Sequence, residues 1–278
     1  MKFITGLTAV AAAILVSSTP VSAAGCADGK TMTSGVLTIA TGNPAYSPWV
    51  MNDAPESGEG YEAAVALELA RRLGFEKSAV AWVRTSFDEA IQPGPKNFDF
   101  NLQQFSIRPE RAQAIDFSDP YYLAGKALVV RKDVAERLGS DLSAEKIRDL
   151  QFGGASGQTS AIFISKVIKP TKDVLLYEDL SDVQAAMMAN QAEATVVDVP
   201  TSLFLTAVRY PDGRIVGQFA KSNDETDDKF GLLFAKGSPL KDCANKALAD
   251  MKADGTLANL EATWLNKKAG IPVIDLGK

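Results

Sequence analysis

The chain has 278 residues, of which 46% are hydrophobic and 23% are charged, and its formal net charge is -5. This balance is typical of a globular protein and argues against disorder and against binding to nucleic acid, which needs clustered positive charge. The sequence contains no histidine, which excludes an imidazole base, a histidine-activated nucleophile and a histidine-ligated metal.

The N-terminal residues have the pattern of a secretory signal peptide. Lys2 precedes an apolar run, 3–16, that is short for a membrane span, and Val21-Ser22-Ala23 fits a small-residue cleavage site. A retained membrane anchor is the alternative, but no later segment approaches 18 continuous apolar residues. We therefore predict that residues 1–23 are a signal peptide and that the protein is periplasmic.

Two cysteines remain, Cys26 and Cys243. An even pair in an exported chain favours one disulfide, here between the mature N-terminus and a segment near the C-terminus. The competing interpretation is lipidation of Cys26, because residues 23–26 resemble a lipobox that lacks its usual leucine. Two free thiols are least expected in an oxidising compartment.

The first half of the mature chain alternates strands with helices. The β-branched run 36–40 predicts a strand, and Val65, Leu69 and Leu73 lie on one face of a predicted helix that Gly74 terminates. Further strands at 80–83 and 98–102, with a short helix at 87–91 between them, complete the pattern. Such alternation indicates a parallel sheet covered by helices.

The second half repeats the pattern. We predict strands at 127–130, 151–154, 174–177 and 194–197, and helices at 142–150, 159–167 and 201–207, with another helix opening in a capping box formed by Ser181 and Gln184. Short extended runs follow at 215–216 and 231–235. Helices at 240–252 and 256–265 end the chain and could pack on either half.

The fold class is therefore α/β, with two lobes. We expect lobe 1 to comprise residues 24–124 plus 219–278 and lobe 2 to comprise residues 125–218. Because no flexible linker separates them, the two chain crossings predict a hinge of two strands. A cleft between two such lobes is the expected ligand site, since open α/β sheets bind ligands at the carboxyl ends of their strands.

Several side chains at predicted strand ends and helix starts suit a zwitterionic ligand. Arg111 offers a fork of donors to a carboxylate, and Asp198 can hold an ammonium group. Taken alone, an arginine such as Arg111 at a helix start is far more often a solvated surface charge. Asp198 is as typical of a helix cap as of a ligand site. Gly157 and its two successors precede a helix whose N–H groups suit an anion, although many helices begin in this way.

Taken in order, these segments resemble the family-3 periplasmic solute-binding proteins, the polar amino acid receptors of ABC importers. The most specific matches are FSIRPERA at 105–112, DFSDPYY at 116–122 and MKADGT at 251–256. Other matching stretches span nearly the whole mature chain: 36–49, 60–74, 98–122, 153–159, 189–198 and 240–265. The resemblance implies a type II periplasmic-binding-protein fold.

The resemblance also implies roles for individual residues. Arg111 matches the arginine that pairs with the α-carboxylate of the ligand, and Asp198 matches the aspartate that accepts from the α-ammonium. Gln158 and Thr159 match donors to the same carboxylate from the second lobe. Because the two charges lie on different lobes, a zwitterion would be satisfied at both ends only when the lobes close.

Other matches concern the ligand side chain. Tyr46 and Phe87 match the aromatic residues that flank it, although each is also an ordinary core aromatic. Gln103, Gln104 and Ser106 lie in the segment that usually presents smaller polar residues, so the two glutamines should reshape the pocket.

The resemblance bears on ligand charge as well. Asn43 stands where receptors for basic ligands carry an aspartate. The loss of that carboxylate argues against a cationic side chain and favours a neutral or polar one.

We therefore expect an amino acid receptor of an ABC importer, a monomer that partners permease subunits and needs no cofactor or metal. The alternative is an exported enzyme similar to the cyclohexadienyl dehydratases, which would need an acid with a raised pKa beside the ligand. Glu62 and Glu193 are candidates, though nothing in the sequence singles out either. A sensory domain of the same fold is disfavoured because the sequence has no signalling segment.

Overall fold

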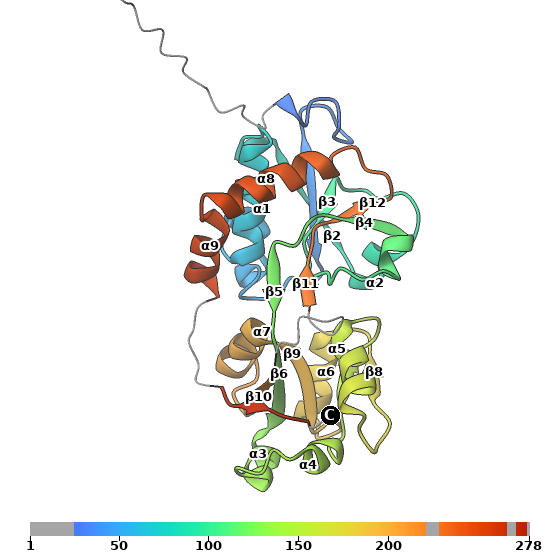
Figure 1. The fold of residues 1–278 in the computed structure, drawn as a ribbon, viewed down its shortest axis with the longest axis vertical. Helices are drawn as coiled ribbons and strands as arrows, with labels where there is room; N and C mark the ends of the chain where they lie inside the picture. Colours follow the sequence, from blue (N-terminus) through green and yellow to red (C-terminus); the bar gives the residue numbers. More distant parts are fainter. Residues whose placement is uncertain (1–24, 221–227, 266–270, 277–278) are drawn as a thin grey trace, which may run out of the picture.

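The computed structural model describes residues 25–220, 228–265 and 271–276. The predicted signal peptide, residues 1–23, lies outside this part of the chain. The described residues form two α/β lobes joined by a narrow connection (Figure 1). The predicted two-lobed fold is thus confirmed.

Lobe 1 is built on a sheet with the strand order β2-β1-β3-β12-β4. β1 runs parallel to β2 and β3 because helices α1 and α2 make the crossovers, whereas β12 is antiparallel to both of its neighbours. The bounds are β1 Leu37–Gly42, α1 Tyr61–Arg72, β2 Val80–Thr85, α2 Phe87–Ile91, β3 Phe100–Asn101, β4 Ile115–Phe117 and β12 Leu233–Ala235.

The two closing helices, α8 (Lys241–Ala253) and α9 (Thr256–Trp264), pack on α1 and therefore belong to lobe 1. Their apolar side chains, such as Leu248 and Met251, share one buried core with Val65 and Leu69 of α1. Burial of these large side chains contributes roughly 1.5–3 kcal/mol each, which fixes the helices on this lobe.

Lobe 2 contains a second sheet, with the order β13-β10-β6-β9. β7 and β8 form a parallel pair, and a bridge between Phe152 and Ala194 links that pair to β9. The strands are β6 Lys126–Arg131, β7 Gly153–Ala155, β8 Leu175–Tyr177, β9 Ala194–Asp198, β10 Gly213–Phe219 and β13 Val273–Ile274. The helices are α3 Lys132–Leu138, α4 Ala144–Arg148, α5 Thr159–Phe163, α6 Leu180–Met188 and α7 Val199–Phe204.

The end of the chain corrects one sequence-based boundary. All of residues 219–278 were expected in lobe 1, but β13 pairs with β10 in the sheet of lobe 2. Ile274 is buried in the lobe 2 core against Phe219. A strand of two residues is too short to show the alternation from which strands are recognised, so the sequence carried no signal of this return.

The hinge consists of β5 (Tyr122–Ala124) and β11 (Asp228–Phe230), which pair antiparallel between the lobes (Figure 1). Trp49 of the first loop packs edge-on against Tyr61, Tyr122 and Phe230, with ring centroids 5.2–5.8 Å apart. Edge-to-face aromatic pairs add about 0.5–1.5 kcal/mol each beyond their buried area. The predicted two-strand hinge is confirmed, and an aromatic cluster supports it.

Helix termini agree with the sequence in one case and differ in another. Gly74 adopts a φ of +93° just beyond α1, as expected for a glycine that ends a helix. The cap of α6, however, is Asp179, whose carboxylate accepts from the Asp182 N–H at 3.0 Å. The predicted capping box at Ser181 is therefore wrong, because Asp179 begins the helix two residues earlier.

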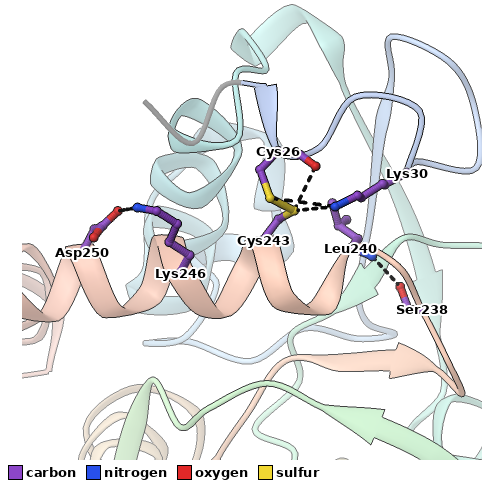
Figure 2. Close-up of a disulfide and its surroundings, with 7 residues drawn as sticks. All are labelled: Cys26, Lys30, Ser238, Leu240, Cys243, Lys246 and Asp250. Atoms are coloured by element: carbon purple, nitrogen blue, oxygen red, sulfur yellow. Dashed lines mark hydrogen bonds and ion pairs between the residues drawn. A yellow bond between two sulfur atoms is a disulfide. The ribbon is translucent and has the colours of Figure 1, made fainter. Parts of the chain in front are cut away.

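Cys26 and Cys243 form a disulfide that joins the N-terminal segment to α8 (Figure 2). Their Cα atoms are 5.7 Å apart, and Lys30 donates to the Cys243 sulfur from 3.3 Å. A sulfur in a disulfide cannot also carry a lipid, so this pairing argues against lipidation of Cys26. In the described part of the chain, the helices are too short or too polar to cross a membrane.

Candidate functional site

A cleft lies between the lobes, next to the hinge, and its lining draws on both lobes. Nine residues predicted from the sequence line it: Tyr46, Phe87, Gln103, Gln104, Ser106, Arg111, Gln158, Thr159 and Asp198. They lie at the carboxyl end of β9, or in the loops and first helical turns that follow β1, β2, β3 and β7. The carboxyl ends of these strands therefore converge on the cleft, as expected for open α/β sheets.

Asn43 is the predicted site residue that the structure leaves out of this lining. It is exposed in the turn after β1, and Tyr46, three residues later, is the part of this loop that reaches the cleft. Asn43 therefore supplies no evidence about the ligand side chain in this arrangement.

Arg111 opens a short 3-10 turn (Arg111–Gln113) in lobe 1, and only 8% of it is exposed. Its guanidinium donates to the carbonyl oxygen of Ser106 at 3.0 Å and to that of Gly157, in lobe 2, at 2.7 Å. The Phe87 ring lies 5.1 Å from the guanidinium carbon. Burial lowers the pKa of Arg111 to about 10, so the group stays charged at neutral pH and favours an anionic partner.

Asp198 ends β9 and also caps α7, since its carboxylate accepts from the Thr201 N–H at 2.7 Å. Burial raises the pKa of this carboxyl to about 6, the Thr201 N–H opposes the rise, and the nearby Asp228 charge adds to it. The cap and the proposed ammonium site are therefore the same group. A cationic ligand group would lower this pKa by favouring the ionised form.

Asp228 belongs to this site, although the sequence analysis did not identify it. This hinge residue is buried, lines the cleft and accepts from the Ser106 hydroxyl at 2.7 Å. It also pairs with Arg108 at 3.3 Å and with Lys126 in a short contact. Donors from both lobes thus meet on one carboxylate, which offsets its charge before any ligand binds.

Other lining residues also escaped the sequence analysis: Ser160, Leu180, Val197, Thr201 and Phe230. Ser160 and Val197 neighbour predicted residues, and proximity alone would have suggested them. Asp228 and Phe230 enter through the second hinge strand, which has three residues and shows no distinctive pattern.

Three further contacts connect the two lobes across the cleft. Trp49 donates from its indole N–H to the Thr201 hydroxyl at 2.8 Å. The hydroxyls of Tyr46 and Ser181 lie 3.2 Å apart, as do those of Ser106 and Thr159 at 3.3 Å. Together with the bond from Arg111 to Gly157, these contacts hold the described structure in a closed arrangement.

The candidate acids of the sequence analysis lie in different places. Glu62, in the first turn of α1, is buried and contacts Gln104 and Tyr121 beneath the cleft floor. Glu193 lies away from the cleft and pairs with Arg137 at 2.6 Å. Neither residue is part of the lining.

The known proteins to which this chain is similar include several amino acid-binding proteins. Similar curated proteins include the L-cystine-binding protein TcyJ of Escherichia coli, 26% identical with 79% of each chain covered, and the ABC transporter glutamine-binding protein GlnH of Bacillus subtilis, 28% identical with 77% of this chain and 76% of the relative covered. A similar solved structure is the ancestral amino acid-binding protein AncCDT-1, described as a precursor of cyclohexadienyl dehydratase. It is 27% identical, with a TM-score of 0.66 over 84% of this chain and 96% of that one.

The model of one protein family matches residues 37–267, which include both sheets' principal strands, the hinge and the whole cleft lining. That match covers most of the chain and agrees with the two-lobed fold. The chain therefore belongs to the bacterial extracellular solute-binding proteins of family 3.

Proposed function

We propose that this protein is the receptor of an ABC importer and binds an amino acid, or a similar zwitterion, in the cleft between its lobes. The observation that carries the proposal is that Arg111 of lobe 1 and Asp198 of lobe 2 line the same cleft. Arg111 would hold the ligand carboxylate and Asp198 its ammonium group. A ligand held by both favours the closed form, which the permease would recognise.

The charges of the cleft favour a neutral side chain on the ligand. Among the residues that the structure describes, Arg111, Asp198 and Asp228 are the charged members of the lining. The first two are satisfied by the ligand backbone, and Asp228 is already paired with Lys126 and Arg108. A charged side chain would then be buried without a partner, which is unfavourable, whereas Gln103 and Gln104 suit a polar one.

The remaining parts of the proposal concern the localisation of the protein, its oligomeric state and its partners. Residues 1–23 would direct export to the periplasm and then be removed, and the mature protein would act as a monomer with permease subunits. The disulfide between Cys26 and Cys243 supports an oxidising compartment. The curated relatives named above support an importer as the partner.

A dehydratase is the second candidate, and one observation favours it. The pKa of Glu62 is raised to about 7, chiefly by burial, which suits a general acid. Its carboxylate, however, is bound by Tyr121 and Gln104 and lies outside the lining. Turnover of prephenate or arogenate by the purified protein would establish this activity. Absence of turnover would favour the receptor function over the dehydratase.

The receptor is tested by thermal-shift screening of the purified protein against the amino acids, followed by calorimetric titration. A ligand at 100 times its Kd stabilises the folded state by about 2.7 kcal/mol. A true ligand would raise the melting temperature of the wild type but not of Arg111→Ala. A screen in which no amino acid raises the melting temperature would contradict the proposal.

A further inference from the structure

Gln104 lines the cleft floor, and the buried carboxylate of Glu62 lies directly behind it. The Gln104 backbone N–H donates to Glu62 Oε1 at 2.8 Å, and its side-chain amide donates to Glu62 Oε2 in a short contact. Gln104 has a φ of +50°, a conformation that is uncommon outside glycine. Two bonds to one carboxylate thus hold both the backbone and the side chain of this residue.

The two oxygens of Glu62 have different surroundings. Oε1 accepts both the Gln104 backbone N–H and the Tyr121 hydroxyl, whereas Oε2 accepts the Gln104 side-chain N–H. An ionised carboxylate is an acceptor only, so the amide must turn its NH₂ group toward Oε2. The amide oxygen of Gln104 then faces away from Glu62.

We propose that Glu62 is a positioning residue that fixes the orientation of the Gln104 amide and so makes Gln104 a hydrogen-bond acceptor toward the ligand. If the proposed receptor function holds, on which this step rests, the preferred ligand has a neutral side chain that carries a donor, such as an amide or a hydroxyl. Glu62 need not touch the ligand to select it.

Protonation of Glu62 should reverse the orientation of the Gln104 side-chain amide. Because Oε1 already receives two donors, the proton goes to Oε2 and makes that oxygen a donor toward Gln104. The amide must then turn through about 180°, so that its oxygen accepts from Glu62 and its NH₂ group faces the cleft. The ligand preference should therefore change with pH.

The groups around Glu62 set the pH at which it becomes protonated, and this pH is near neutral. Burial raises the pKa of Glu62 to about 7, the Asp198 charge adds to the rise, and the bonds from Tyr121 and Gln104 oppose it. Burial also raises the pKa values of Tyr121 and of the neighbouring Tyr61, so both hydroxyls remain protonated donors. Among these groups, Glu62 and Asp198 are the ones that titrate between pH 5 and 8.

The substitution Glu62→Gln should lock the reversed state at every pH. Its amide oxygen would take the place of Oε1 and accept from Tyr121 and the Gln104 backbone. Its NH₂ group would take the place of Oε2 and donate to Gln104. The variant keeps the size of the side chain, so a purely structural role of Glu62 would predict little change in the orientation of Gln104.

The first experiment follows the side-chain amide resonances of Gln104 by NMR in the ligand-free, full-length mature protein. In the wild type they should move with a midpoint near pH 7, the value to which the Glu62 pKa is raised. In Glu62→Gln they should stay at the low-pH position. The control Glu68→Gln, which changes a half-buried ion-pair carboxylate of the same helix, should titrate as the wild type does.

A second variant gives a readout that a structural role would not move. Tyr121→Phe removes a donor that lowers the Glu62 pKa, so the Gln104 midpoint should shift to higher pH. A flat Gln104 titration in the wild type, or the same titration in Glu62→Gln, overturns the inference. This result does not depend on whether any amino acid binds.

Calorimetric titration with two probes tests the consequence for ligands. L-glutamine carries a side-chain donor, and the γ-methyl ester of L-glutamate replaces that donor with a methoxy group of similar size. At pH 8 the wild type should favour glutamine, and Glu62→Gln should reduce the ratio of the two affinities about tenfold, the effect of leaving one acceptor unpaired. An unchanged ratio overturns the role in selectivity, whereas a failure of all amino acids in the screen contradicts only the proposed receptor function.

Discussion

Arg111 of lobe 1 donates to the carbonyl oxygen of Gly157 in lobe 2 at 2.7 Å, and this bond crosses the cleft that the two lobes enclose. Gly157 immediately precedes Gln158 and Thr159, which also line the cleft. One arginine therefore contacts the opposite lobe and directs its charge at the space between the lobes. Binding of a carboxylate by Arg111 would be coupled directly to the relative position of the lobes.

The substitution Arg111→Ala should abolish binding of the amino acid found by screening. Removing one partner of a buried, hydrogen-bonded charge pair costs about 2–5 kcal/mol, so the affinity should fall at least 30-fold. Calorimetry measures the affinity, and thermal unfolding should remain cooperative. Arg137→Ala, which removes an exposed arginine away from the cleft, is the control, and equal affinities in both variants would remove Arg111 from the site.

The substitution Asp198→Asn should weaken binding of the amino acid more than binding of its deaminated analogue. Asparagine is as good a helix cap as aspartate, so α7 should keep its start while the negative charge is lost. The expected difference is about tenfold or more, because only the amino acid has an ammonium group to lose its partner. Equal losses for the two ligands would show that Asp198 does not hold the ammonium group.

The affinity for an amino acid should decline as the pH falls below about 6, the value to which burial raises the pKa of Asp198. The neutral carboxyl no longer attracts an ammonium group, so binding near this pH should release a proton. The stability of the ligand-free protein should have the opposite pH dependence. Because the folded-state pKa lies above the unfolded one, the folded form holds more protons, and this contribution to stability grows as the pH falls from about 7 toward 4.

Calorimetry in buffers of different ionisation enthalpy measures the proton release, and denaturant unfolding measures the stability. Asp198→Asn should remove the Asp198 contribution to both effects, while Glu62→Gln separates the contribution of the second buried carboxyl. An affinity that stays constant between pH 7.5 and pH 5 would contradict the role of an ionised Asp198.

The sequence predicted the parts of the fold that have a strong local pattern. The helix that ends before Gly74 was predicted from Val65, Leu69 and Leu73, which are four residues apart, and the structure has α1 at Tyr61–Arg72. The hinge strands β5 and β11 and the final strand β13 are each two or three residues long. Such strands are specified by pairing with distant segments, so no local pattern could reveal their partners.

The same distinction applies to the candidate site: residues with a local sequence pattern were predicted, and the others were not. Arg111 and Asp198 follow predicted strands or lie in recognisable motifs, and both line the cleft. Asp228 lies in a hinge strand without a distinctive pattern, and its importance arises from Ser106, Arg108 and Lys126, more than 100 residues away. Glu62 was visible in the sequence, but its relation to Gln104 depends on how α1 packs beneath a loop that begins after β3.

The last prediction concerns the buried pair of Lys126 and Asp228, whose side chains are 4% and 5% exposed. Lys126→Met should destabilise the fold by about 3 kcal/mol, because removing one partner leaves the other charge buried and less well compensated. The double substitution Lys126→Met with Asp228→Asn should destabilise it by less than the sum of the single changes, since neither charge then remains. Urea unfolding of the wild type and the three variants gives the coupling energy. The exposed pair Lys246 and Asp250 on α8, 2.9 Å apart, is the matched control, and its coupling should stay below about 1 kcal/mol. A buried pair that couples no more strongly than this exposed one would show that Lys126 and Asp228 do not support the hinge through their charges.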